Sequence, residues 1–483
     1  MHSEGVLRAG FARADITPSM GGIPLAGYGQ TSKRLAADIL DRLYAHIIAL
    51  GNGEETEVLL ITCDLVSIPD DLYEKVKKAV HETTGLAEER ILVGGTHTHS
   101  APDIRNTEMP SIPKYNEEWP AKIAAEAPYA IEDMKPAQVF YGSEEVGHPG
   151  ARINFCRHYL LARVEEPDVP VMFCGDNFND VYSHDTAHYV YCGHQEEADP
   201  MVQVICLKRE NADDICMINF QAHDHVTGGF TRPDMSSDYS GALVKQLEEK
   251  YPHLKCSYFN GAAGNINPHT RMLSDGIPGV TFGARRDHRA YARILAFHVQ
   301  DVLENGLKES ESSVVRLKKR IYTGQIDHTQ DHRAETAKEI VERFKKETTL
   351  PAISPKFLEE CHKLGFNGPF EANAVLRHLA MGTEKSLELN VLRIGDCAFT
   401  TNPFEMFNDT AVFIKEHSPF KLTFVKSYSC GASSYLPSKD SPDNSYERNQ
   451  TLFVRGTAED IADKVVETLN ELAEETGYVS TRG

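Results

Sequence analysis

The segment Ile91–Ser100, with the sequence ILVGGTHTHS, constrains the fold of this chain more than any other segment. Its three leading apolar residues favour β structure and predict a buried strand, and the two glycines after them let the chain turn. Two imidazoles, His97 and His99, follow. Ligands of open α/β sheets bind beyond the carboxyl ends of the strands. The segment therefore predicts an α/β sheet whose strand presents both rings to a metal or a substrate, the alternative being two unrelated histidines in a polar loop.

A βαβ unit is predicted around this strand. Apolar runs at Tyr44–Leu50 and Val58–Cys63 flank Gly51-Asn52-Gly53, which is a strong hairpin turn. A helix with one apolar face begins near Pro69 and leads to the strand at Ile91. Further strands alternate with helical segments along the chain. The sequence therefore predicts a mixed α/β fold, in which largely parallel or mixed central sheets are flanked by helices.

Three more predicted strands end in residues that can bind a metal or move a proton. These residues are His223 and His225 after Ile215–Phe220, Glu405 after Ala398–Thr400, and Tyr435 in the loop after Leu422–Val425. Imidazole and carboxylate are the ligands expected for a catalytic zinc that keeps one position open for water. Such a metal lowers the pKa of its water to about 7 and polarises a carbonyl group. The alternative is that each residue is an ordinary polar group at a sheet edge.

We expect one domain over residues 1–483, with no repeats and no linker. A charged helical insertion at about 326–385 is interpreted either as a cap over the pocket or as an oligomer contact, so homo-oligomerisation is left open. Residues 101–150 are rich in proline and glutamate and are expected to form a long covering segment. Residues 183–199 are expected to be a surface loop whose histidines are exposed. These histidines are His184, His188 and His194.

Composition limits the partners of the chain. A formal net charge of -21 would repel nucleic-acid phosphates and anionic membranes over most of the surface. No apolar run approaches the roughly 20 residues of a membrane span, and the first residues lack the apolar core of a signal peptide. The 10 cysteines are scattered without a CxxC pair, which favours free thiols in a reducing compartment. We therefore expect a cytoplasmic protein with a small-molecule substrate, no nucleic-acid partner and no stable membrane insertion.

Short motifs follow one another in order along the chain. They are ADITP at 14–18, THTHS at 96–100, NFQAH at 219–223, SSDYSG at 236–241, GAAGNINP at 261–268, PFE at 403–405 and YLPS at 435–438. Together they resemble the catalytic domain of the neutral/alkaline (non-lysosomal) ceramidases and their bacterial relatives, from about Gly10 to the last helix. Members of that family are zinc-dependent amidases that cut the amide bond of N-acylsphingosine. The resemblance implies a ceramidase-like catalytic domain with Zn²⁺ as its cofactor.

The resemblance also implies roles for individual residues. The implied zinc ligands are His97, His223, Glu405 and Tyr435, with His225 as a substitute for His223. The residues implied to surround the scissile group are His99, Arg157 and Tyr446. Donors of this kind can stabilise an oxyanion and protonate a leaving amine. Asp238 matches a recurrent acidic position, where a carboxylate can orient a ligand histidine without binding the metal itself.

The chain also departs from the family pattern. Ceramidases usually have a secretion signal and a C-terminal immunoglobulin-like domain, and neither is recognisable here. Gly261 stands where they have serine, Asn265 where they have aspartate, and Phe404 where a glycine precedes the glutamate. We therefore expect a zinc hydrolase in which metal-bound water attacks the amide of a ceramide-like or smaller soluble N-acyl compound. The alternatives are a zinc hydrolase of esters, lactones or glycosides, and a non-catalytic, metal-stabilised binding protein.

Overall fold

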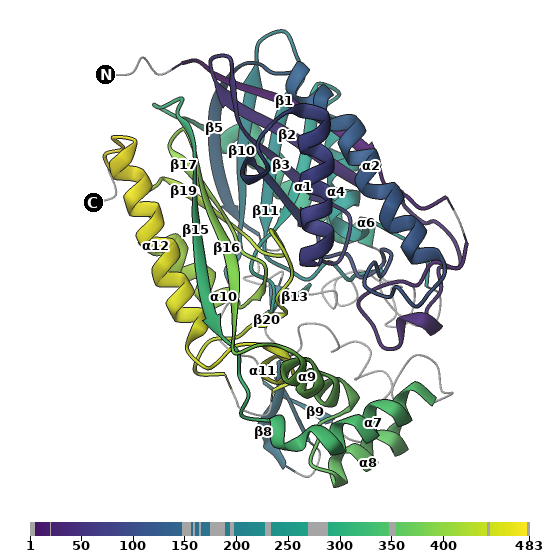
Figure 1. Cartoon of the computed structure of the whole chain (residues 1–483). Coiled ribbons are helices and arrows are strands. Elements are labelled where there is room, and N and C mark those ends of the chain that lie inside the picture. Colours follow the sequence, from purple (N-terminus) through teal and green to yellow (C-terminus); the bar gives the residue numbers. More distant parts are fainter. Residues whose placement is uncertain are drawn as a thin grey trace, which may run out of the picture.

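The larger of two main sheets has the strand order β12-β11-β10-β5-β1-β2-β3-β4, with β14 added beside β5 (Figure 1). The computed structural model describes residues 5–19, 21–146, 156–157, 160–163, 166–173, 189–193, 198–227, 233–268, 288–346, 354–441 and 445–480. The strands are β1 (Leu7–Asp15), β2 (Tyr44–Asn52), β3 (Glu55–Cys63), β4 (Ile91–Gly95), β5 (Lys135–Glu145), β10 (Met201–Arg209), β11 (Asp214–Phe220), β12 (Leu254–Asn260) and β14 (Lys308–Glu309). The sheet is mixed, because β3 runs parallel to β4 and β11 to β12 while the other neighbours are antiparallel.

The smaller sheet has the order β15-β16-β17-β19 and is also mixed, with β17 parallel to β19. Its strands are β15 (Val315–Gln325), β16 (Glu384–Ile394), β17 (Cys397–Thr401) and β19 (Leu422–Lys426). Side chains alternate between its two faces, as the period of a strand requires. Phe399 and Phe424 join the core of the larger sheet, whereas Ala398 and Val425 join a core with α10 (Asn408–His417) and α12 (Thr457–Glu475). The smaller sheet therefore lies between the larger sheet and these two helices.

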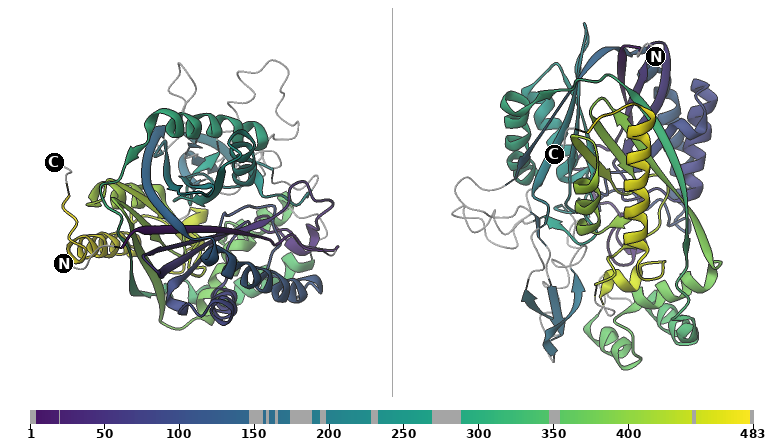
Figure 2. Two further views of the ribbon diagram at one scale, coloured as in Figure 1. Left: turned by 90° about the horizontal axis from the view of Figure 1, so that it is seen from above. Right: turned by 90° about the vertical axis from the view of Figure 1, so that its left-hand side faces the viewer.

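Two pairs of helices cover the larger sheet. The helices are α1 (Asp70–Thr84), α2 (Ser111–Glu132), α4 (Asp238–Lys250) and α6 (His288–Asp301). The first two pack near β1, β2 and β4, and the other two near β10 and β12. Seen from above, the sheet bends between these pairs (Figure 2, left). The bend brings β12 against β3, where Thr62 Oγ1 donates a hydrogen bond to the carbonyl of Tyr258 at 3.2 Å.

The predicted fold class is confirmed, and so is the predicted βαβ unit of β3, α1 and β4. Residues 101–150, predicted to be a covering segment, contain helix α2, which covers part of the larger sheet, and strand β5, which is itself a strand of that sheet. Two prolines, Pro120 and Pro128, lie inside α2, whose buried face carries the fully buried Trp119. The three histidines predicted to be exposed in 183–199 lie outside the described residues.

Three helices occupy most of the predicted insertion at 326–385: α7 (Ala334–Lys346), α8 (Pro355–Lys363) and α9 (Pro369–Ala380). They share a small core of their own, which includes Ile340, Phe357 and Val375. Figure 1 shows them at one end of the sheets, with α9 next to the short helix α11 (Tyr446–Gln450). The single-domain count, and the role of the insertion as a cap or an oligomer contact, stay predictions.

No helix within the described residues combines the length and the apolar character that a membrane span needs. The cysteines whose side chains are described are all buried free thiols, as the sequence predicted; they are Cys63, Cys206, Cys216, Cys256, Cys361, Cys397 and Cys430.

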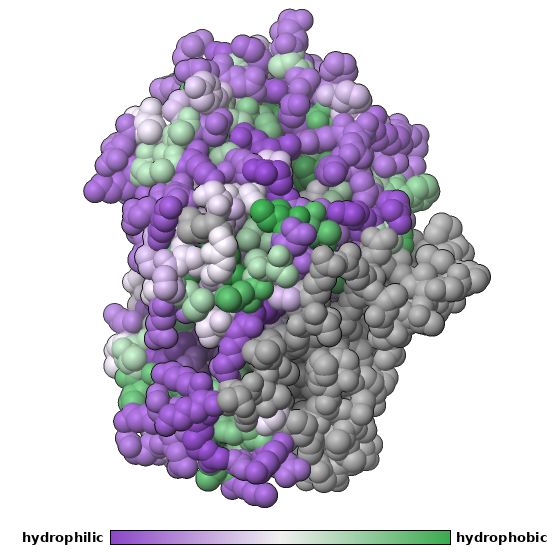
Figure 3. Space-filling model, turned by 90° about the vertical axis from the view of Figure 1, so that its right-hand side faces the viewer, coloured by the Kyte–Doolittle hydropathy of each residue, from purple (hydrophilic) through white to green (hydrophobic). Residues whose placement is uncertain are grey.

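The face on the right of Figure 1 is mostly hydrophilic where it is described, with apolar residues gathered near its middle (Figure 3).

The packing of the two sheets can be tested at Phe399, which is 2% exposed and lies edge-on to Phe259 with ring centroids 5.1 Å apart. The change Phe399→Ala should lower the free energy of unfolding by about 3–5 kcal/mol in urea denaturation, because it leaves a cavity between the sheets. Phe413→Ala is the matched control, since Phe413 on α10 is 37% exposed. Equal losses in both variants would contradict the assignment of Phe399 to the inter-sheet core.

Candidate metal centre

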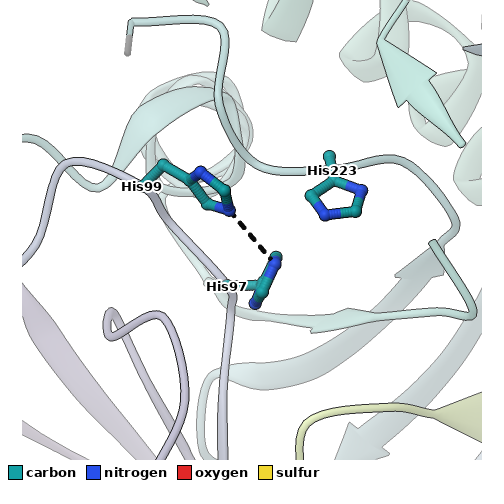
Figure 4. A group of neighbouring side chains, drawn as sticks. All are labelled: His97, His99 and His223. Carbon is teal, nitrogen blue, oxygen red and sulfur yellow. Dashed lines mark hydrogen bonds between the residues drawn. The ribbon is translucent and has the colours of Figure 1, made fainter. Parts of the chain in front are cut away.

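The three parallel strand pairs of the two sheets end close together, and each brings predicted site residues. His97 and His99 follow β4, His223 and His225 follow β11, and Glu405 follows β17 at the start of the short strand β18 (Glu405–Met406). Three of the four imidazoles, from two distant segments, form one buried group within coordination range of a single ion (Figure 4). The structure thus brings these strand ends together, and the assignment of individual residues as metal ligands stays a prediction.

The turn into His97 depends on close backbone packing. Gly94 and Gly95 belong to strand β4, so the prediction that they let the chain turn was wrong. A Cβ on Gly94 would lie 2.0 Å from Ser429 Oγ, and one on Gly95 would lie 2.5 Å from the carbonyl oxygen of Leu65. Glycine is needed there because neighbouring chains pass close by. The turn itself falls at His97, which adopts a left-handed φ of 71°.

The segment after β19 packs against this turn and holds it in place. The Nζ of Lys426 donates hydrogen bonds to the carbonyls of Gly95, at 2.5 Å, and of Ser427, at 2.7 Å. Burial lowers the pKa of Lys426 to about 7. The ring of Tyr428 stacks on the His97 ring, with centroids 3.8 Å apart and planes 16° apart. These contacts fix both the backbone and the ring plane of His97.

Backbone carbonyls set the tautomers of two imidazoles. His97 Nδ1 lies 2.7 Å from the carbonyl oxygen of Val66, and His223 Nδ1 lies 3.2 Å from that of Ile266. A carbonyl only accepts hydrogen bonds, so each Nδ1 carries a proton, and in the neutral ring Nε2 is the nitrogen that keeps its lone pair. This is the arrangement in which metal-binding histidines are usually held.

Glu405 adds a carboxylate to these two imidazoles. Its Oε2 lies 3.5 Å from the Nε2 atoms of both His97 and His223. Burial raises the pKa of Glu405, and the two histidines, when protonated, lower it by more, so the carboxylate is ionised. A divalent cation in place of those protons would act in the same direction. Two ligands about 2.1 Å from a tetrahedral ion are roughly 3.4 Å apart. Two lone pairs and a carboxylate at this spacing fit a divalent cation.

His99 lies beside this set. Its Nε2 is 3.2 Å from His97 Nε2, which also places it within coordination range (Figure 4). Burial lowers the pKa of His99 well below its usual range, and the neighbouring histidines lower it further, so the ring is neutral. The structure thus allows two ligand sets, one with His97, His223 and Glu405 and one in which His99 replaces Glu405.

The loop of His223 also carries His225 and is held by Asp238. The His225 ring lies next to His99, with centroids 5.5 Å apart, whereas it is His223 that faces Glu405. The geometry therefore favours His223 over His225 as the ligand. Asp238 accepts hydrogen bonds from the backbone N–H groups of Val226 and Thr227, at 3.0 and 2.7 Å. Asp238 thus orients the loop, and backbone carbonyls orient the rings.

The structure describes the side chains of Tyr435 and Tyr446, but only the strand position of Arg157. Tyr435 is buried in strand β20 (Tyr435–Leu436) and is the direct partner of Glu405 in the ladder with β18. The ring of Tyr446 lies edge-on to that of Tyr435, with centroids 5.8 Å apart. Arg157 lies in β6 (Cys156–Arg157), whose partner β13 (Asn267–Pro268) directly follows Ile266. The side chain of Arg157 lies outside the described part of the chain.

Two departures from the family pattern have structural explanations. Phe404 is fully buried and lies edge-on to Phe453, so the position before Glu405 points into the core shared with α12. The Oδ1 of Asn265 accepts a hydrogen bond from the backbone N–H of Asn408 at the start of α10. Both residues hold the loops of the site in place.

Residues 7–154 match the family model described as neutral/alkaline non-lysosomal ceramidase, N-terminal. This part of the chain belongs to that family. The resemblance predicted from the motifs is therefore confirmed. No curated protein matches the chain by sequence.

Two solved ceramidase structures share the fold. The neutral ceramidase of Pseudomonas aeruginosa is 17% identical, with a TM-score of 0.69 over 98% of this chain and 75% of that protein. A ceramidase complexed with C2 is 16% identical, with a TM-score of 0.67 over 98% of this chain and 76% of its own. The ceramidase fold thus extends from the matched N-terminal part over nearly the whole chain.

Sequence reasoning missed the groups that hold the histidines. The carbonyls of Val66 and Ile266 belong to apolar residues and have no sequence signal. Tyr428 could have been suspected, because it follows a predicted strand as the other site residues do. Arg34 was also missed; its guanidinium donates a hydrogen bond to the carbonyl of His99 at 2.8 Å.

Substitution of single histidines should separate the two ligand sets. We expect His97→Ala and His223→Ala to lose bound zinc without loss of fold, because the rings lie on loops at the strand ends. His99→Ala should keep the metal. Elemental mass spectrometry of zinc-loaded, dialysed protein, with circular dichroism for the fold, measures both. His253→Ala is the control, since its side chain is 94% exposed. Loss of zinc in His99→Ala would instead support the three-histidine set.

Proposed function

We propose that this protein is a zinc-dependent hydrolase that cleaves the amide bond of an N-acyl compound, either ceramide-like or smaller and soluble. The observation that carries the proposal is the pair of imidazole lone pairs at ligand spacing from one ionised carboxylate, within a ceramidase fold. His97, His223 and Glu405 would hold the cation, with Tyr435 as a fourth ligand. Two imidazoles and a carboxylate suit zinc among the divalent metals.

A cation bound there would polarise the amide carbonyl and lower the pKa of a water molecule. The side chains of the protein would supply the remaining chemistry. The neutral ring of His99 has one protonated and one unprotonated nitrogen, so it can take up a proton on the second and pass one to the leaving amine. Arg157 and Tyr446 are the proposed donors to the carbonyl oxygen as negative charge develops on it.

A matched substrate panel tests the reaction class. The panel consists of a p-nitroanilide and a p-nitrophenyl ester of the same acyl group, a p-nitrophenyl glycoside and a fluorescent ceramide. We expect zinc-dependent cleavage of the anilide or the ceramide, reduced by about 10²–10⁴-fold in His99→Ala because a general acid–base group is lost. Turnover of the ester or the glycoside alone would reject the amidase proposal. An unchanged rate in His99→Ala would reject the proton-transfer role of His99.

The position of the His99 ring can be tested without changing the histidine. A Cβ on Gly27, whose φ is +94°, would lie 2.3 Å from Cγ of the His99 ring. We expect Gly27→Ala to displace this ring and to lower kcat by at least about tenfold, while zinc content is retained. Gly22→Ala is the matched control, because Gly22 has a φ of +73° and nothing within 4 Å of its Cβ position. An equal loss of kcat in both variants would point to backbone strain alone.

A further inference from the structure

Two arginines that the proposed reaction does not use lie close to the candidate metal centre. Arg105 belongs to the loop that follows His99, and Arg377 belongs to helix α9 of the helical insertion. They come from segments far apart in the sequence, yet each interacts electrostatically with Glu405, with Tyr446 and with the other. Both arginines therefore lie within electrostatic range of the candidate metal centre, where Glu405 is their shared acidic neighbour.

Arg105 is positioned with most of its guanidinium available. Its Nε donates a hydrogen bond to Asp103 Oδ1 at 3.0 Å, and Asp103 is itself held by Thr31 Oγ1 at 2.8 Å. Asp103 raises the pKa of Arg105. The side chain is nevertheless 51% exposed, and no described residue accepts a hydrogen bond from its two Nη groups. Asp103 therefore orients the guanidinium group of Arg105 and leaves its two Nη groups available to a ligand.

Arg377 is more enclosed. Its Nη2 donates hydrogen bonds to the carbonyl oxygen and to Oε1 of Gln450, both at 3.2 Å, which ties α9 to the end of α11. Its Nε is buried and has no acceptor within the described part of the chain. A buried charged donor without an acceptor costs free energy, and an anion in contact with it would remove that cost. Helix α11 begins at Tyr446, so this contact lies next to the proposed catalytic groups.

The local charge favours an anion. Burial lowers the pKa of Arg377, and the nearby Arg105 lowers it further, while Tyr446 and Glu405 oppose the shift. A guanidinium stays charged in a protein in spite of such shifts. A divalent cation at the histidines would add positive charge beside both arginines and neutralise Glu405. The site would then be locally positive within a chain whose formal net charge is -21.

We propose that Arg105 and Arg377 bind a carboxylate on the amine part of the substrate, so that the preferred substrates are N-acyl amino acids. This inference rests on the proposed function and narrows its substrate class. Arginine is the side chain best suited to a carboxylate, because its planar donors match the two oxygens. The helical insertion thus supplies a substrate contact, and α9 approaches the site for that purpose. Ceramide, which is neutral, would leave both guanidinium groups unmatched.

Two substrates with the same acyl chain and the same scissile amide test this proposal. N-octanoylglycine has a carboxylate where N-octanoylethanolamine has a hydroxyl group. For the zinc-loaded protein we expect kcat/KM to be about 10²-fold higher for N-octanoylglycine, since hydrogen bonds to charged groups are the stronger ones. Arg105→Ala and Arg377→Ala should each reduce this preference at least tenfold, chiefly through KM. Arg377→Lys keeps the charge but loses the planar guanidinium group, so its preference for N-octanoylglycine should lie between those of the unchanged protein and Arg377→Ala.

Arg343→Ala is the matched control, because Arg343 lies on α7 of the same insertion, is 42% exposed and pairs with Glu360. The preference of Arg343→Ala for N-octanoylglycine over N-octanoylethanolamine should equal that of the unchanged protein. Equal kcat/KM for the two substrates, or a preference that survives both arginine substitutions, would overturn the proposal and leave the amidase function intact.

A binding measurement separates the two proposals. 4-Oxoundecanoate, in which a methylene group replaces the amide N–H of N-octanoylglycine, is titrated calorimetrically into the zinc-loaded protein, which cannot cleave it. Binding that weakens at least tenfold in both arginine variants, but not in Arg343→Ala, supports the carboxylate site even if neither substrate is cleaved. That combination would reject the amidase function alone. Binding of equal strength in all variants would reject the carboxylate site.

Discussion

The structure depends on the contact between the end of β4 and the segment that follows β19. Gly94 pairs with Ser429 in an isolated bridge, the N–H of Gly95 donates to the carbonyl of Tyr428, and the N–H of Cys430 donates to Val93. This contact joins the end of the larger sheet to the smaller one. It also places the His97 turn above Lys426 and Tyr428. Together with the core contact between Phe259 and Phe399, it holds the carboxylate of the smaller sheet near the imidazoles of the larger one.

The same backbone groups decide the chemistry of the site. Carbonyls that accept from Nδ1 of His97 and His223 force both lone pairs toward Glu405. When both rings are neutral, these lone pairs face a buried carboxylate, and a cation between the three groups would stabilise that arrangement. Arg105 and Arg377, which interact with Glu405, have the opposite charge to this carboxylate. The imidazoles and the carboxylate suit a metal, and the arginines suit an anionic group.

Much of this arrangement could be predicted from the sequence, for a physical reason. A strand that ends in histidine, glutamate or tyrosine has a clear pattern, because the apolar run fixes the strand and the polar residue follows it. The convergence of His97, His223 and Glu405 was predicted in this way. Helix α2 was missed because Pro120 and Pro128 argue against a helix locally, and tertiary packing around Trp119 overrides that preference.

Other features have no local signal. The carbonyls that orient the rings belong to Val66 and Ile266, whose side chains say nothing about their oxygen atoms. The meeting of Arg105 with Arg377 depends on how the helical insertion packs against α11, and sequence spacing cannot show that. Gly94 and Gly95 were recognised as important for the wrong reason, since close approach requires them and a turn does not.

The wide separation of the proposed ligands along the chain has a consequence for assembly. His97, His223 and Glu405 come from loops that follow β4, β11 and β17, so no fragment comprising only one sheet contains all of them. Closing such long loops slows folding, because chain entropy is lost before the contacts form. A metal ion held by these residues could bind tightly only after both sheets have docked, and its binding energy would then stabilise the finished molecule. Metal uptake would therefore be a late event in the maturation of this protein and would mark its completion.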